Sequence, residues 1–307
     1  MNSLNEDNLT EKSLIDWLKA QGYEHVYGPD INPGQPQSER EDFRDVVLKD
    51  RLLGAVRRIN PSLPAEQAEA VVKEIADYSH GDLILGNKEV YSWIVNGKKI
   101  TFREGGEEKT ELVKLVDFKE PSANEFLAVN QFTVQGIDAI CRLDLVVFVN
   151  GLPLTIFELK SAVRESANIG EAYRQIERYK KEIPKIFLYN QVIGLSDFHN
   201  ARHGNISSSW ERYGTWKGIV FPTDTPKNSN QLEILAKGLF DKVRFLDVIQ
   251  NFFVFEADGD GEAVTFTKKM CLYHQYYGVN ATVESTIRSV RGEQDHKIGV
   301  FWHTQGS

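Results

Sequence analysis

The stretch RLDLVVFVNGLPLTIFELK, residues 142–160, decides the fold. Two runs rich in β-branched and aromatic residues flank Asn150-Gly151, a pair that favours a tight turn between antiparallel strands. We therefore predict a β-hairpin. If its turn centres on Gly151, the numbers of cross-strand partners sum to 302. The expected partners are Phe148 with Leu154, Val146 with Ile156, and Asp144 with Glu158.

This register gathers charged residues at one end of an apolar face. Because side chains alternate between the faces of a strand, Asp144, Glu158 and Lys160 share one face. Two opposed carboxylates repel each other unless a cation compensates, and Mg²⁺ prefers one or two carboxylates with several retained waters. The pattern predicts a magnesium site for phosphodiester hydrolysis, in which Lys160 stabilises charge that builds on the phosphate. In the alternative reading, both acids are solvated strand ends or pair with Arg142 and Lys160.

A helix is predicted downstream of this hairpin, from Asn168 to Lys181, because its apolar residues follow helical spacing. Gln175 and Tyr179 are four residues apart and hence neighbours on the helix surface. They are placed to reach a site at the sheet edge. Their plainer interpretation is a surface amide and a core aromatic.

Asp144, Glu158-Leu159-Lys160 and Gln175-x-x-x-Tyr179 together resemble the nuclease motifs of the restriction (R, or motor) subunits of type I restriction-modification enzymes. The likeness covers nearly all of residues 38–307. In one departure, Leu143 stands where the family usually has proline, which supplies no catalytic group. Further similar segments are Val129–Gln135, Val149–Leu154, Phe157–Ser161, Ile183–Phe187, Leu195–Asp197 and Glu211–Trp216.

The resemblance implies an α/β fold with a RecB-like PD-(D/E)xK restriction-endonuclease core, a mixed central sheet flanked by helices. It also implies a division into residues 1–37, an N-terminal helix and connector; 38–258, the endonuclease domain; and 259–307, a linker helix and the first strand of a helicase-type motor domain.

The same resemblance implies roles for individual residues. Asp144 and Glu158 would ligate Mg²⁺, for which Mn²⁺ would substitute, with the backbone carbonyl of Leu159 as a further ligand. Lys160 would be the catalytic lysine. Gln175 and Tyr179 would support the site or contact the DNA backbone. Glu39 is either an extra acid near the metal or a solvated helix residue.

Local patterns predict further elements outside the hairpin. Helical spacing runs from Glu39 to about Asn60, from about Ala65 to Tyr78, and from about Asn230 to Gln250. Asn96-Gly97, between two strand-like runs at 91–95 and 99–102, predicts a second hairpin.

The C-terminal segment resembles the start of a motor domain. Lys297–Trp302 is predicted to be a strand, but His303–Ser307 lacks the lysine and hydroxyl of a phosphate-binding loop. We therefore expect a fragment without ATPase activity of its own, and ATP binding only in the full-length subunit. Tyr273-His274-Gln275 is similar to an adenine-reading motif at the start of a helix that runs to about Val290. Gln275 is thus either a nucleotide contact or a surface glutamine.

Composition limits the class of protein and the compartment in which we expect it. The net charge of −8 argues against a protein that coats DNA through a broad positive field. Cys141 and Cys271 lie in no Cys or His cluster, so a disulfide framework or a zinc site is not expected. Without an apolar stretch long enough for a membrane span, or a signal peptide, we expect a cytoplasmic protein with no membrane partner.

Together these patterns predict a Mg²⁺-dependent nuclease region, and the resemblance implies that it cuts unmodified double-stranded DNA. The resemblance implies a complex that translocates DNA with ATP and contains modification (methyltransferase) and specificity subunits. The alternative is a catalytically silent docking module that links the motor to those subunits. A stand-alone helicase fragment is disfavoured by the missing phosphate-loop lysine.

Overall fold

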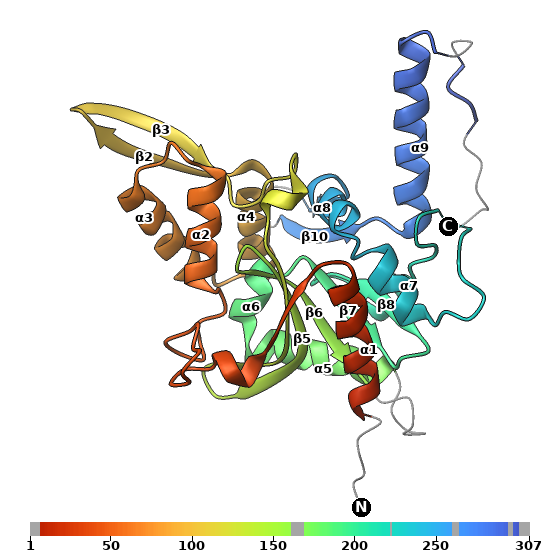
Figure 1. Cartoon of the computed structure of the whole chain (residues 1–307), viewed down its shortest axis with the longest axis horizontal. Coiled ribbons are helices and arrows are strands. Elements are labelled where there is room, and N and C mark those ends of the chain that lie inside the picture. The colour runs from red at the N-terminus through yellow and green to blue at the C-terminus, as the bar shows by residue number, and fades with distance from the viewer. Residues whose placement is uncertain (1–6, 161–168, 222, 260–263, 294–296, 301–307) are drawn as a thin grey trace, which may run out of the picture.

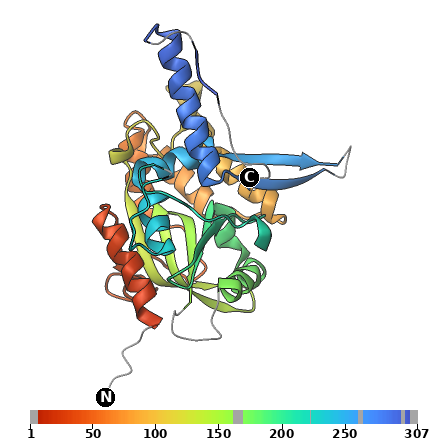
Figure 2. The same ribbon diagram turned by 90° about the vertical axis from the view of Figure 1, so that its right-hand side faces the viewer.

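The computed structural model describes residues 7–160, 169–221, 223–259, 264–293 and 297–300. They form a mixed six-stranded sheet of order β1-β4-β5-β6-β7-β8, flanked by helices (Figures 1 and 2). The β1–β4 and β6–β7 pairs are parallel and the others are antiparallel. The predicted α/β fold with a mixed central sheet is confirmed. The strands are β1 Glu24–Tyr27, β4 Phe126–Gln135, β5 Ile140–Val149, β6 Leu152–Leu159, β7 Val192–Ser196 and β8 Ala201–Gly204.

Helices cover both faces of this sheet, as Figure 2 shows. On one side lie α5 (Ile169–Glu182) and α6 (Pro184–Tyr189). On the other, α1 (Asp7–Ala20) packs with α7 (Gln231–Gly238). Every residue of β6 is buried. A strand covered on both faces has no solvent side, which explains why its sequence is almost continuously apolar.

The segment before the sheet differs from the sequence-based expectation. Its helix begins at Lys49 rather than Glu39, and the run at 91–95 lies in helix α4 rather than in a strand. Asp82 caps α4 by accepting a hydrogen bond from the Leu85 N–H at 2.8 Å. Packing of α4 on α6 overrides the local strand propensity. The elements here are α2 Lys49–Ile59, α3 Ala65–Ala76, α4 Leu83–Asn96, β2 Lys98–Glu104 and β3 Glu107–Val113.

The C-terminal part of the chain contains a second ribbon and a projecting helix (Figure 1). The helical stretch predicted at 230–250 is two helices, because Asp241 caps a new one through the Arg244 N–H. The helix predicted from Tyr273 to about Val290 is confirmed, whereas residues 297–300 form no strand. Residues 301–307, with the rest of that predicted strand and the His303–Ser307 segment, lie outside the described residues. The remaining elements are α8 Lys242–Asn251, β9 Phe253–Asp258, β10 Thr265–Met270, α9 Tyr273–Val290 and the short 3-10 helices Gly28–Ile31, Pro121–Ala123 and Trp210–Arg212.

In the part of the chain that the structure describes, no helix is both long enough and apolar enough to cross a bilayer.

Candidate active site

The β5–β6 hairpin turns through Asn150 and Gly151, whose φ angles are +52° and +79°. Two positive φ values belong to the turn that matches strand twist best, and Val149 pairs with Leu152 across it. The predicted pair Val146–Ile156 is confirmed. The predicted pair Phe148–Leu154 is wrong, because Phe148 pairs with Pro153.

An irregularity between Val147 and Phe148 accounts for this difference. A two-residue turn alone would offset the strands by one residue, and the irregularity shifts the register back before the acids are reached. Leu145 then pairs with Phe157, as a sum of 302 requires. Without the shift, Glu158 would lie opposite Leu143 and on the other face from Asp144. The register shift therefore brings the two acids to one face.

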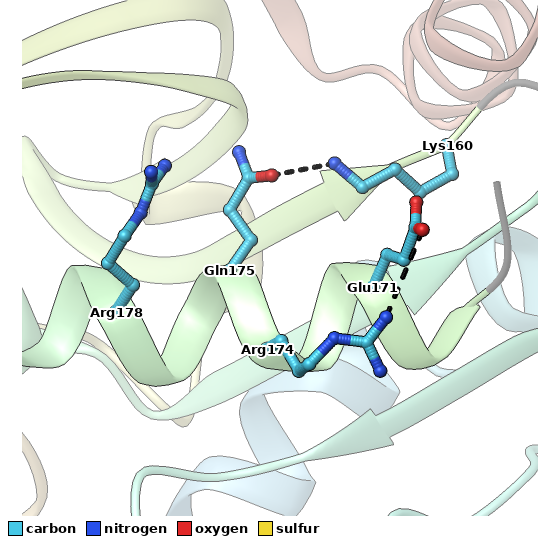
Figure 3. Close-up of a pocket in the computed structure, with 5 residues that line it drawn as sticks. All are labelled: Lys160, Glu171, Arg174, Gln175 and Arg178. Carbon is cyan, nitrogen blue, oxygen red and sulfur yellow. Dashed lines mark hydrogen bonds and ion pairs between the residues drawn. The ribbon is translucent and has the colours of Figure 1, made fainter.

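Five predicted site residues come together in the structure. Asp144 Oδ2 accepts a hydrogen bond from the Leu159 N–H at 2.7 Å. Lys160 Nζ donates to Glu158 Oε1 at 2.7 Å and to Gln175 Oε1 at 2.8 Å, the second contact being drawn in Figure 3. The Gln175 amide in turn donates to the Tyr179 hydroxyl. A connected network thus runs from β6 to α5.

Helix α5 is held against the sheet by its own apolar face. Ala172, Ile176 and Tyr179 are buried at helical spacing. The Tyr179 hydroxyl donates to the backbone carbonyl of Arg142 at 3.3 Å. Tyr179 is therefore both a core aromatic and a member of the polar network, so the two interpretations of this residue are compatible.

The burial of Asp144 and Glu158 side by side costs free energy when both are ionised. Glu158 is fully buried in contact with the Asp144 carboxyl group, and no N–H or hydroxyl group of the described residues donates to its Oε2 atom. Burial, and then the neighbouring Asp144 charge, raises the pKa of Glu158 to about 8. Burial also raises the pKa of Asp144 to about 6. Two buried acids in contact repel each other when both are ionised, and a divalent cation would relieve this repulsion.

Few side chains at the site could ligate a metal ion. Among the described residues, no group of three or more His, Cys, Asp or Glu side chains is placed to hold a metal ion. Mg²⁺ is commonly bound through one or two carboxylates and retains water in its other positions. Asp144 and Glu158 fit that mode of binding.

Glu39 lies outside this site. Its carboxylate accepts hydrogen bonds from Arg51 Nε at 2.6 Å and Nη2 at 2.7 Å, in a segment that is not helical. Arg51 also binds Glu24 and Glu125. Both predicted roles of Glu39 are therefore replaced by a structural one, in an ion-pair cluster beside the hairpin turn.

A different acid, Glu11 of α1, lies near the site and was missed from the sequence. Its carboxylate accepts hydrogen bonds from the side chains of Asn130 and Gln131. Its charge contributes to the raised pKa of Asp144, after burial. Gln131 has a φ of +55°, and the β4–β5 register, which is the same on both sides of it, places Gln131 opposite Asp144. No local pattern links Glu11 to residues so distant along the chain.

Gln275 has a local role in the structure. Its side-chain oxygen accepts a hydrogen bond from the Leu272 N–H at 2.8 Å at the start of α9. This contact satisfies one of the backbone donors that a helix leaves open at its N-terminus.

Comparison with known proteins assigns the sequence to a family. Residues 3–212 match the family described as "Type I restriction enzyme R protein N terminus". The chain belongs to this family. The type I restriction enzyme HindI endonuclease subunit of Haemophilus influenzae is 39% identical over 99% of the chain. The provisionally named type I restriction enzyme MjaIXP endonuclease subunit of Methanocaldococcus jannaschii is 34% identical, also over 99% of the chain.

The chain spans 29% and 30% of the lengths of these two relatives. It therefore corresponds to an N-terminal region of type I R subunits. This membership confirms the family resemblance seen in the motifs around Asp144 and Glu158. The network of Asp144, Glu158, Lys160, Gln175 and Tyr179 belongs to that R-subunit region.

Proposed function

We propose that this R-subunit region is a Mg²⁺-dependent endonuclease of the PD-(D/E)xK type, which hydrolyses phosphodiester bonds of unmodified duplex DNA. One observation carries the proposal. Asp144 and Glu158 are buried in direct contact on one sheet face beside Lys160, and no N–H or hydroxyl group of the described residues donates to Glu158 Oε2. Two buried carboxyl groups in contact repel each other unless they share a proton or bind a cation.

Asp144, Glu158 and the backbone carbonyl of Leu159 would hold the metal ion, with Mn²⁺ as a substitute. When bound, Mg²⁺ supplies electrostatic stabilisation of the negative charge on the reacting phosphate. In the hydrolysis, water forms a new bond to phosphorus and loses a proton to solvent, while the bond to the leaving oxygen breaks and that oxygen takes up a proton from solvent.

Lys160 stabilises the charge that builds on the phosphate in the transition state. Its ammonium is fixed by Glu158 on one side and by Gln175 on the other. Tyr179 in turn fixes the Gln175 amide. Gln175 and Tyr179 are therefore positioning residues in this proposal, because they reach the phosphate through Lys160.

The rest of the proposal concerns the whole enzyme. We infer from the family that the intact subunit translocates DNA with ATP, and that it works in the cytoplasm in a complex with modification (methyltransferase) and specificity subunits. Duplex DNA is the expected substrate. Recognition of the target sequence would belong to another subunit, because the proposed roles of the residues at this site involve the phosphate and not the edges of the bases.

The test combines cleavage with metal binding. Asp144→Asn and Lys160→Ala, introduced into the full-length subunit and assembled with its partner subunits, should each slow duplex cleavage at least about 100-fold. ATP turnover and assembly should stay at the wild-type level. In the 307-residue chain, Mn²⁺ should raise the melting temperature of the wild type and not of Asp144→Asn.

Unchanged cleavage in both variants would remove the proposal and favour the docking module instead. Loss of assembly or ATP turnover together with cleavage would point the same way, because the residues would then serve the structure of the complex.

A further inference from the structure

Helix α5 carries two arginines beside the candidate site. Arg174 and Arg178 line a surface pocket together with Lys160, Glu171 and Gln175. Figure 3 shows Arg178 and Gln175 extending from α5 toward the same side as Lys160, while Arg174 lies nearer the Glu171 end of the pocket. The arginines are thus neighbours of the proposed catalytic lysine.

Their guanidinium groups are only loosely engaged. Arg174 lies 3.9 Å from Glu171 and Arg178 lies 3.6 Å from Glu182, beyond ordinary hydrogen-bond length. The side chains are 69% and 58% exposed. Each therefore retains donors that an incoming group can use.

Other arginines of the chain are used differently. Arg51 is hydrogen-bonded to three carboxylates, and Arg40 is buried with bonds to the Asn32 side chain and the Thr133 carbonyl. Those side chains hold segments of the fold together. Neither Arg174 nor Arg178 makes a comparable hydrogen bond, although the Arg178 guanidinium lies 5.5 Å from the centre of the Tyr179 ring.

Electrostatics explain why basic groups are needed at this place. The chain has a net charge of −8, and the site itself presents Asp144 and Glu158. A DNA strand must bring its phosphates to these acids, which repel it. Lys160 already binds Glu158 and Gln175. Cations immediately beside the site would offset this repulsion.

We propose that Arg174 and Arg178 bind successive phosphates of the DNA strand that flank the reacting phosphate. They are four residues apart, which separates their positions by about 6 Å along the axis of α5. A guanidinium presents a fork of donors that suits bidentate binding of a phosphate. The inference rests on the proposed function, because the proposed catalytic residues define the position of the reacting phosphate.

The experiment measures DNA binding without metal, so that it does not depend on cleavage. The 307-residue chain and its Arg174→Gln/Arg178→Gln variant are titrated in EDTA with a fluorescent duplex over a series of salt concentrations. The variant should bind at least about 10-fold more weakly at low salt. The slope of log affinity against log salt should become less steep by about 2, because about 0.9 is lost with each phosphate contact.

Two further variants separate charge from structure. Arg174→Lys/Arg178→Lys keeps both charges and should retain the wild-type salt slope with a smaller loss of affinity. Arg57→Gln/Arg103→Gln makes the same charge change on α2 and β2, far from α5 in Figure 1, and should bind like the wild type. Equal melting temperatures would show that the folds are intact.

The inference fails if the Gln variant binds with wild-type affinity and slope, if the α2 and β2 control loses as much, or if the wild-type chain does not bind duplex DNA. The proposed function is tested separately by Asp144→Asn and Lys160→Ala. Lost cleavage in those variants, with unchanged DNA binding in the arginine variant, would overturn the inference alone.

Discussion

His203 lies in the core with neither ring nitrogen hydrogen-bonded, packed against Trp216 at 5.7 Å between ring centroids. Burial lowers its pKa to about 4, from the ordinary value of 6.5. The folded state therefore binds fewer protons than the unfolded state between these pH values. The contribution of neutral His203 to the free energy of unfolding is therefore fully present above pH 6.5 and is lost as the pH falls toward 4.

We predict that the free energy of unfolding, measured by urea titration, falls by up to about 3 kcal/mol from this residue between pH 7.5 and pH 4.5. His203→Phe should show a shallower decrease. His199→Phe, at an exposed position, should keep the wild-type decrease. An equally steep decrease in His203→Phe would show that other groups cause the acid sensitivity.

At the scale of elements, the β5–β6 hairpin is the unit that places the acids. Its turn is locked from outside as well as by its own residues, because the Asn150 side chain donates to the Leu115 carbonyl and to Asn124. The Gly151 carbonyl also accepts a hydrogen bond from the Leu48 N–H. The turn and its surroundings therefore fix the register together.

Gly151→Ala should destabilise the protein through this turn. Gly151 has a φ of +79°, and a Cβ there would lie 2.4 Å from the Leu48 carbonyl oxygen. Strain and the close contact together should cost about 2–4 kcal/mol of unfolding free energy. Gly105→Ala is the matched control, because its φ is +62° and nothing lies within 4 Å of the added Cβ. It should cost about 1 kcal/mol. Equal losses would show that the contact with α2 does not matter.

At the scale of the whole molecule, a buried lysine joins segments that are distant along the chain. Lys268 of β10 is 1% exposed and donates to Asn87 of α4 at 2.9 Å, and to Gln191. Its ammonium also lies 4.5 Å from the centre of the Phe253 ring. Burial lowers the pKa of Lys268 well below its usual range. These contacts attach the β9–β10 ribbon, which leads into α9, to the body that carries the site.

Lys268→Met should loosen this attachment. The Asn87 and Gln191 oxygens would lose their buried donor, which should cost about 2–4 kcal/mol of unfolding free energy. Hydrogen exchange of residues 253–270 should become faster than in the wild type. Lys269→Met changes the adjacent residue, whose side chain is 52% exposed, and should stay within about 0.5 kcal/mol of the wild type. Unchanged exchange in Lys268→Met would show that other contacts hold the ribbon.

Local sequence patterns account for the parts of this protein that depend on neighbouring residues. The Asn150-Gly151 turn, the strand runs on either side, helix α5 and helix α9 follow from periodicity and turn chemistry within a few residues. The common face of Asp144 and Glu158 was also predicted, but from a turn centred on Gly151, whereas in the structure it depends on the register shift between Val147 and Phe148, which the local pattern did not predict.

Contacts between distant segments fixed the remaining features of the fold and of the site. Packing against α6 made residues 83–96 a helix, and Arg51 drew Glu39 into an ion-pair cluster. The approach of α1 brought Glu11 near Asp144, and the packing of α5 joined Gln175 to Lys160. Such contacts are set by which apolar faces bury one another. A local pattern predicts which face of a helix or strand is apolar. Only the fold determines which other element packs against that face.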